Sequence, residues 1–357
     1  MAKVAIIGTQ GVPAKYGGFE SLVENLIGPN KSPEIDYTVL CSAKDMKQDI
    51  KEYKGAHLKY VPLLRANGVQ SIPYDILSML KVIKGYDVIL VLGVSGCIFL
   101  PVLKVLSRSK LVVNIDGLEH RRDKWGRFAK WFLRKSESVA VHNADIVVSD
   151  NKGIQDYVRE TYNKESVLIA YGGDHVIRSV PEVQQEKVLE EFKLSSGQYS
   201  MTVCRIEPEN NCHITLEAFS KTDKTLAFIG NWNRSEYGIS LREKYKNCHN
   251  IKMLDPIYDL DTLYTLRNHC SSYVHGHSAG GTNPSLVEAM FFGKPIFCFD
   301  VVYNRATTFD KAYYFKNSDD LVNLLNTSHL EGKIMADIAN RNYTWKHIAS
   351  QYESLYE

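Results

Sequence analysis

The sequence predicts an α/β protein made of two doubly wound domains. Short apolar runs rich in β-branched residues alternate with amphipathic helical segments. This alternation starts again after a hydrophilic stretch at residues 178–191. At 357 residues the chain also exceeds the size at which one hydrophobic core stops growing. Because alternating strands and helices form parallel sheets covered on both faces, we expect two such sheets in tandem with a ligand cleft between the domains.

In the first half, seven apolar runs predict strands, and segments such as 19–28 and 153–162 between them have helical patterns. The predicted strands lie within residues 3–8, 36–42, 57–63, 87–93, 110–116, 144–150 and 166–173.

In the second half, five further runs predict the strands of a second sheet, again with helices between them. These runs occupy residues 199–205, 225–231, 250–256, 271–276 and 294–300. We therefore expect domains at 1–175 and 176–340. In the final segment, 341–357, an apolar helical face is predicted to pack back toward the N-terminal domain, and it is formed by Trp345, Ile348, Tyr352 and Leu355.

The composition is that of a globular protein, since 44% of the residues are hydrophobic and 24% charged. The seven cysteines are widely spaced without a C-x-x-C pair, so we expect reduced thiols and no zinc site. The N-terminus runs directly into a strand without the pattern of a signal peptide. The longest apolar stretch, Val88–Leu103, is broken by glycine and proline and falls short of a membrane span. We therefore expect a cytoplasmic location.

A glycine-rich loop, residues 8–20, follows the first strand and leads into a helix. Glycine lets the backbone approach a ligand closely, and amides at the following helix N-terminus favour a phosphate. The spacing is not G-x-G-x-x-G, so a dinucleotide fingerprint is not supported. The other interpretation is a long connection without a ligand.

An arginine, Arg205, ends the first strand of the second domain. A guanidinium is permanently charged and binds phosphate oxygens with a planar fork, so Arg205 is a candidate diphosphate ligand. The structural alternative is an ion pair with Glu207 or Glu209.

A strand, a glycine loop and a helix start are predicted at residues 275–290. Pro284 suits a first helical turn, where neighbouring amides would face a phosphate. Glu288 lies one turn into an otherwise apolar helix, and two ribose hydroxyls would serve as its partners. His275 and His277 share a strand face without an evident third ligand, so we expect histidines with hydrogen-bond partners rather than a metal site.

The run GGTNPSLVEAMFFGKPI at 280–296 resembles the nucleotide-sugar signature of the family 4 glycosyltransferases, which are retaining enzymes of the GT-B fold. The resemblance implies two Rossmann-like doubly wound domains with a cleft between them. A narrower resemblance is to bacterial rhamnosyltransferases of capsule and cell-wall polysaccharide synthesis, and four segments carry it: 8–20, 114–125, 205–211 and 300–308. In that family the first domain is the acceptor side and the second binds the nucleotide-sugar donor.

The resemblance also implies site residues. Arg205 would neutralise the donor diphosphate, Glu288 would hold the ribose, and Ile257 and Tyr258 would border the base. Backbone would be presented to the diphosphate by Gly17, Gly18, Gly281, Thr282, Asn283, Pro284, Ser285 and Leu286.

Two positions depart from the family pattern. Asn210 stands where the family has a lysine, and Gly280 stands where it has a first glutamate. These changes remove one cation and one carboxylate from the donor pocket. We expect Arg305 to supply the missing positive charge.

The segment 114–125 lies where the wider family has a histidine that touches the donor sugar, and Asp116 takes about that place, followed by Glu119. A carboxylate there can stabilise an oxocarbenium-like transition state or accept the acceptor's proton. The alternative for Asp116 is turn chemistry with Gly117. We expect a metal-independent reaction without a cofactor, in which Arg205 and backbone amides stabilise the departing diphosphate.

Seven basic residues and four aromatic residues interleave within Arg121–Lys135. A basic helix with aromatic residues on its other face is typical of a membrane interface, which would suit a lipid-linked acceptor at the inner face of the plasma membrane. The alternative is a solvated face over a packed core, and nucleic-acid binding has no recognition module to support it.

Together these features predict a transferase that moves L-rhamnose from dTDP-rhamnose, with retention, onto a lipid-linked or polysaccharide acceptor. Two alternatives remain. One is a nucleotide-sugar epimerase of the same fold, and the other is a non-catalytic regulator that binds sugar nucleotides.

Overall fold

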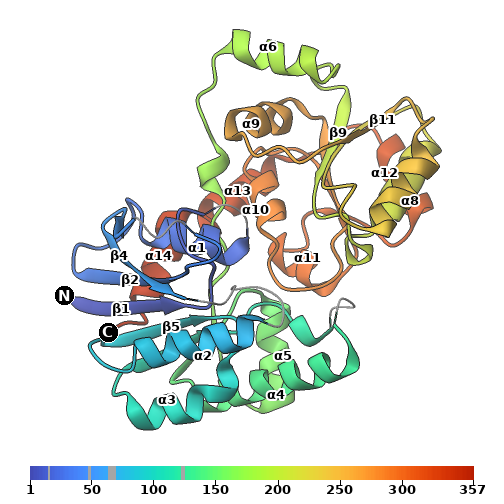
Figure 1. Cartoon of the computed structure of the whole chain (residues 1–357). Helices are drawn as coiled ribbons and strands as arrows, with labels where there is room; N and C mark the ends of the chain where they lie inside the picture. Colours follow the sequence, from blue (N-terminus) through green and yellow to red (C-terminus); the bar gives the residue numbers. More distant parts are fainter. Residues whose placement is uncertain (15–16, 47–49, 63–69, 122–124) are drawn as a thin grey trace. The chain divides into compact units, whose positions relative to one another are not determined.

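The computed structural model describes residues 1–14, 17–46, 50–62, 70–121 and 125–357. Residues 15, 16, 63 and 122–124 of the predicted segments lie outside this description. The chain divides into two compact units (Figure 1). Unit 1 comprises Met1–Tyr171 together with Trp345–Glu357, and unit 2 comprises Gly172–Thr344.

Unit 1 contains a sheet whose strand order within the described residues is β3-β4-β2-β1-β5-β6-β7-β8. Its pairs are parallel except for the β3–β4 hairpin, so the predicted parallel sheet is confirmed. The strands are β1 (Ala2–Ile7), β2 (Ile35–Ser42), β3 (Glu52–Tyr53), β4 (Ala56–Val61), β5 (Val88–Leu92), β6 (Lys110–Asn114), β7 (Ile146–Ser149) and β8 (Val167–Leu168).

The helices of unit 1 lie on both faces of this sheet, as right-handed crossovers between parallel strands require. One face carries α1 (Gly18–Leu26) and α14 (Trp345–Glu353). The other carries α2 (Ser71–Lys81), η2 (Cys97–Phe99), α3 (Leu100–Leu106), α4 (Arg127–Asn143) and α5 (Lys152–Tyr162), as Figure 1 shows. A short turn, η3 (Glu119–Arg121), precedes α4.

The last helix, α14, belongs to unit 1 because its apolar side chains pack into the core of that unit. Strands buried on both faces read as continuous apolar runs, and β5 is buried along its whole length. The apolar face predicted for the last segment is buried in the same core as the aliphatic side chains of α1 and β1. Its members are Trp345, Ile348, Tyr352 and Leu355.

Unit 2 is a second parallel sheet, with strand order β11-β10-β9-β12-β13-β14 within the described residues. Its strands are β9 (Tyr199–Val203), β10 (Thr225–Ile229), β11 (Ile251–Leu254), β12 (Ser272–His275), β13 (Ile296–Phe299) and β14 (Tyr313–Phe315). Its helices and turns are η4 (Asp174–Val176), α6 (Glu182–Glu191), η5 (Pro208–Asn210), α7 (Cys212–Ser220), α8 (Glu236–Tyr245), α9 (Leu260–His269), α10 (Pro284–Met290), α11 (Val302–Thr307), α12 (Ser318–Asn326) and α13 (Lys333–Asn342).

Each sheet has a point at which the order of its strands reverses. In unit 1 the first strand, β1, lies between β2 and β5, and in unit 2 β9 lies between β10 and β12. Ligands of open α/β sheets bind at such a point, beyond the carboxyl ends of the strands. Among the described residues, no helix is long and apolar enough to cross a membrane.

Candidate functional site

The loops that follow β9 and β12 are fastened to each other at the reversal point of unit 2. The backbone amide and the hydroxyl of Ser278 both donate to the carbonyl of Glu209, at 2.9 and 2.8 Å. The side-chain amide of Asn211 donates to the carbonyl of Gly276 at 2.9 Å. Gly276 is required at this point, because a Cβ atom there would lie 2.3 Å from the carbonyl oxygen of Asn210. The two segments predicted to bind the donor therefore form one structural element.

Arg205 lies on the first of these loops, two residues after the end of β9. Its side chain is 30% exposed, and its Nη1 atom lies 3.7 Å from Oε2 of Glu207. At that distance the pair is a loose contact rather than a bidentate hydrogen-bonded bridge. The guanidinium thus keeps donors that a phosphate could use.

Asn210 does not take over the role of a lysine. It is buried, and its Nδ2 donates to the carbonyl of Arg205 at 2.6 Å, so the side chain folds back onto its own loop. Its Oδ1 atom is buried without a hydrogen-bond partner among the described residues.

His275 is a second buried polar group without a full set of partners. Burial lowers the pKa of its imidazole to about 3, so the ring is neutral at pH 7. Its Nε2 atom has no partner within the part of the chain that the structure describes, which corrects the expectation of a satisfied histidine. The ring stacks on His277, with 5.8 Å between the centroids. Two buried polar atoms thus lack hydrogen-bond partners among the described residues. One is on Asn210 in the segment after β9, and the other is on His275 at the end of β12.

Asn283 caps α10 in the predicted phosphate-binding segment. Its Oδ1 accepts from the amide of Ser285 at 3.0 Å and from the hydroxyl of Ser285 at 2.8 Å. The amide of Leu286 donates to the carbonyl of Asn283 at 3.1 Å, and Pro284 has no amide hydrogen. Two of the amides expected to face a phosphate, those of Ser285 and Leu286, are therefore occupied within the turn.

Glu288, on α10, has protein partners that the sequence analysis did not identify. Arg267 on α9, whose side chain is 4% exposed, donates from Nη2 to Glu288. His175 of η4 lies 3.6 Å from the other carboxylate oxygen. Burial lowers the pKa of His175 more than the nearby carboxylate raises it, so its ring is predominantly neutral at pH 7. The carboxylate is held in a fixed orientation while 18% of the side chain stays exposed.

The remaining donor-side residues also belong to unit 2. Ile257 and Tyr258 follow β11, with Ile257 half-buried and the ring of Tyr258 exposed. Gly280 has φ +102° and is buried, Gly281 is half-buried, and Thr282 is buried. A left-handed backbone at position 280 favours glycine, so the glutamate of the wider family would be strained there.

Arg305, on α11, is already paired with two carboxylates. Its Nε and Nη1 atoms contact Asp300 and Asp310, the latter at 3.0 Å, and its guanidinium carbon lies 4.1 Å from the ring centroid of Tyr314. Hydrogen bonds to Asp300 and then Asp310 raise the pKa of Arg305 further. Arg305 would have to leave these partners to replace the missing lysine.

In unit 1, the glycine loop after β1 is shaped by two carboxylates of α1. Glu20 accepts from the hydroxyl of Thr9 at 3.0 Å and the amide of Gln10 at 2.9 Å, while Glu24 accepts from the amide of Ala14 at 2.9 Å. Gly17 has φ +131°, and a Cβ atom there would lie 1.9 Å from a carboxylate oxygen of Glu20. These carboxylates compete with any phosphate for the loop amides.

Gly18 begins α1 next to this loop. A Cβ atom there would lie 3.5 Å from the hydroxyl of Tyr171, an ordinary contact, so the structure gives Gly18 no steric requirement comparable to that of Gly17.

Asp116 and Glu119 lie on the loop after β6. Asp116 has φ +60°, a left-handed conformation that aspartate tolerates, and its amide donates to Oδ1 of Asn114 at 2.9 Å. Glu119 accepts from the indole of Trp125 at 3.0 Å. The structure thus brings the two predicted catalytic carboxylates onto one short turn of unit 1, and Arg205 belongs to unit 2.

Glu137, a residue that sequence reasoning missed, anchors this loop to α4. Its side chain is 1% exposed, and it accepts from Tyr157 at 2.8 Å and Tyr162 at 2.7 Å through Oε1. Its Oε2 atom lies 3.1 Å from Nδ1 of His120 in η3. The only sequence signal was an acid within a basic helix.

The basic segment before α4 differs from its prediction in one respect. The helix begins at Arg127, and Phe128 and Trp131 lie exposed on the same outward side as Arg134 and Lys135, not on an opposite face. Their spacing of three and four residues produces this arrangement. Arg122, Lys124 and Asp123 lie outside the described residues.

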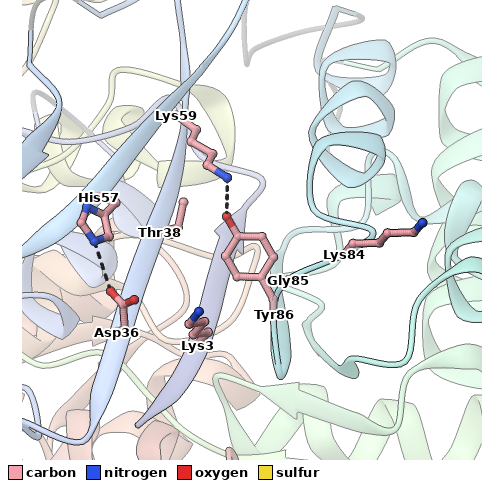
Figure 2. Close-up of a pocket in the computed structure, with 8 residues that line it drawn as sticks. All are labelled: Lys3, Asp36, Thr38, His57, Lys59, Lys84, Gly85 and Tyr86. Atoms are coloured by element: carbon pink, nitrogen blue, oxygen red, sulfur yellow. Dashed lines mark hydrogen bonds and ion pairs between the residues drawn. The ribbon is translucent and has the colours of Figure 1, made fainter.

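A pocket of about 260 Å³ lies at the other end of the sheet of unit 1 (Figure 2). Its lining includes Lys3, His57, Lys59 and Tyr86, and Lys59 donates to the hydroxyl of Tyr86 at 2.9 Å. Lys3 is the second residue of β1, so this pocket is at the amino ends of the strands, away from the loops that follow their carboxyl ends. Among the described residues, no group of histidine, cysteine, aspartate and glutamate side chains is arranged to hold a metal ion.

Two family models match the chain. Residues 1–174 match a domain of unknown function, DUF1972, and residues 184–345 match glycosyl transferases group 1. No curated protein matches the chain.

Solved structures match over essentially the whole chain at low sequence identity. Sucrose-phosphate synthase from Thermosynechococcus elongatus has a TM-score of 0.82 and 15% identity, covering 100% of this chain and 98% of its own. HepE from Anabaena in complex with UDP has a TM-score of 0.77 and 15% identity, covering 99% of each chain. A glycosyltransferase from Rickettsia africae has a TM-score of 0.75 and 12% identity, covering 99% of this chain and 97% of its own. The fold is therefore GT-B, as predicted.

Proposed function

We propose that this chain, which has a GT-B fold and whose residues 184–345 match glycosyl transferases group 1, transfers a sugar from a nucleoside-diphosphate donor to an acceptor hydroxyl. The observation that carries the proposal is the pair of fastened loops at the reversal point of unit 2. The first loop holds Arg205 with donors to spare, and two buried polar atoms lack partners among the described residues, one on Asn210 in that loop and one on His275 at the end of β12. Similar solved structures support the donor class, since HepE was solved with UDP and with UDP-glucose.

In this proposal Arg205 neutralises the negative charge of the departing diphosphate. A guanidinium fixed near developing negative charge stabilises the transition state more than the ground state. Glu288, oriented by Arg267, accepts from the two ribose hydroxyls through its exposed part. Ile257 and Tyr258 border the base, and Gly281 and Thr282 lie beside the phosphates.

We assign the catalytic carboxylate to the loop after β6 of unit 1. Asp116 or Glu119 would stabilise positive charge on the donor sugar or accept the acceptor's proton. Replacing each by alanine tests this assignment, and unimpaired turnover in both variants would exclude it.

The finer proposal is transfer of L-rhamnose from dTDP-rhamnose, with retention, to a lipid-linked or polysaccharide acceptor. A 6-deoxy sugar has fewer hydroxyls to satisfy, so a sugar pocket in which Gly280 stands in place of a carboxylate loses less with it. Peripheral membrane contact through Arg121–Lys135 belongs to the same proposal.

The deciding experiment is incubation with a panel of nucleotide sugars, with and without membrane-derived acceptor. Nucleotide release that requires acceptor supports the transferase. Isomerisation of the donor would indicate an epimerase instead, and binding without turnover would indicate a regulator.

A further inference from the structure

We propose that the outer surface of α2, η2, α3 and α4 in unit 1 is a docking surface for an anionic lipid bilayer. We call it the docking face. It extends the membrane contact proposed above for Arg121–Lys135 to the neighbouring helices and rests on that proposal, while the observations that follow come from the surface of unit 1.

The helix α3 departs from the usual surface pattern because its exposed side is apolar as well as its buried side. A helix that covers a sheet normally buries its apolar stripe and exposes polar residues. In α3, Leu100 and Leu103 are buried, yet Val102, Val105 and Leu106 are exposed, and Val105 is 84% exposed. Ile98 in the preceding turn is exposed as well. This short helix therefore presents apolar side chains on both sides, and within the described residues only one side is buried.

The neighbouring helices extend this apolar surface. Phe128 and Trp131 on α4 are 76% and 56% exposed, with 5.9 Å between their ring centroids. Leu77 and Leu80 are exposed on α2. Contacts join η2 to both α2 and α4, and α3 to α4, so the exposed residues belong to one helical layer, which Figure 1 shows on one side of the sheet of unit 1.

The same layer exposes only positive charge. The only acids in α2, η2, α3 and α4 are Asp75 and Glu137, and both are buried. Arg127, Arg134 and Lys135 are exposed on α4, and no carboxylate pairs with them among the described residues. Their charge is therefore available to an anionic partner.

Exposed apolar side chains together with unpaired positive charge favour a lipid surface over a second copy of the chain as the partner. In a two-fold dimer the same face meets itself, which would bring these unpaired cations together. An anionic bilayer offers headgroup charge to the basic residues and an apolar layer to the valine, leucine and aromatic side chains. Long basic side chains can remain at the headgroup level while neighbouring apolar residues enter the membrane.

The test uses the full-length protein and vesicles of phosphatidylcholine, alone or mixed with phosphatidylglycerol. In flotation, wild type is expected to bind the anionic vesicles, to bind neutral vesicles weakly, and to be released by salt. Val105→Asp is expected to lower the partition coefficient roughly tenfold or more. Replacing Arg134 and Lys135 by glutamine is expected to lower it about 25-fold, since each basic residue near an anionic surface contributes a factor of about five.

Matched controls lie on unit 2. Val183 is 64% exposed and Lys187 and Lys224 are exposed there, so Val183→Asp and the double change Lys187→Gln with Lys224→Gln are expected to leave vesicle binding unchanged. Failure of wild type to bind anionic vesicles, or equal losses in test and control variants, would overturn the proposal. The proposal would also be overturned if wild type did not bind vesicles and instead formed a concentration-dependent dimer that Val105→Asp dissociates. Thermal shift with nucleoside diphosphates, measured on each variant, separates this outcome from failure of the donor site.

Discussion

Replacing Glu288 by leucine leaves the buried guanidinium of Arg267 without its carboxylate. Removing one partner of a buried ion pair costs about 3–5 kcal/mol. We expect the lower end, about 3 kcal/mol, because 18% of the Glu288 side chain is exposed to solvent. Unit 2 spans residues 172–344, which is 173 residues (344 − 172 + 1), and a domain of that size loses roughly 2–4 °C of Tm per kcal/mol. Glu288→Leu is therefore expected to lower the Tm of unit 2 by about 6–12 °C.

The double variant with Arg267→Met and Glu288→Leu separates the structural role from the binding role. Replacing both charges by apolar groups of similar size removes the unpaired ion, so most of the lost Tm is expected to return. Donor affinity is not expected to return, because the ribose hydroxyls still lack their acceptor. Two hydrogen bonds to a charged group contribute about 3 kcal/mol or more, which is roughly 100-fold or more in Kd.

The assay is calorimetric titration of the cognate nucleoside diphosphate into wild type, the single variant and the double variant. A double variant that recovers its Tm and binds the nucleotide as tightly as wild type would refute the ribose assignment. A single variant as stable as wild type would refute the energetic argument for the pair.

Three further predictions follow from buried or constrained groups. Gly280→Glu is expected to destabilise unit 2 by about 1–3 kcal/mol without improving donor affinity, because φ is +102° there; urea unfolding and nucleotide titration check both parts. Glu137→Leu is expected to cost about 3 kcal/mol and to lower turnover, because Tyr157, Tyr162 and His120 lose their common acceptor; an unchanged urea midpoint would contradict this. The pKa of His275 is about 3 in the folded chain and 6.5 in the reference state, so between these values the unfolded state binds more protons and stability falls as pH falls. The loss is about 2 kcal/mol near pH 5, and His275→Gln should flatten that part of the stability profile.

Much of the fold could be predicted because its information is local. Each predicted apolar run overlaps a strand of the structure, and the buried face of α14 was visible as a spacing of three and four residues. The short strands β3 and β14 were not predicted, because a strand of two or three residues has no periodicity of its own.

The site was less predictable because its contacts join distant elements. Arg267 and Glu288 are 21 residues apart in the sequence. Glu137 on α4 accepts hydrogen bonds from Tyr157 and Tyr162 on α5. Arg305 is a different case. Its partners, Asp300 and Asp310, lie five residues to either side, and the expectation that Arg305 replaces a missing cation did not take these nearby carboxylates into account.

The most direct test of the central claim is a thermal-shift titration of wild type and Arg205→Ala with dTDP, UDP and GDP. A ligand at 100 times its Kd stabilises the fold by about 2.7 kcal/mol, which is roughly 5–11 °C for a unit of this size. We predict such a shift for at least one of the three nucleotides in wild type and a markedly smaller shift in Arg205→Ala. Absence of any shift in wild type, or an equal shift in both proteins, would contradict a diphosphate site at the reversal point of unit 2.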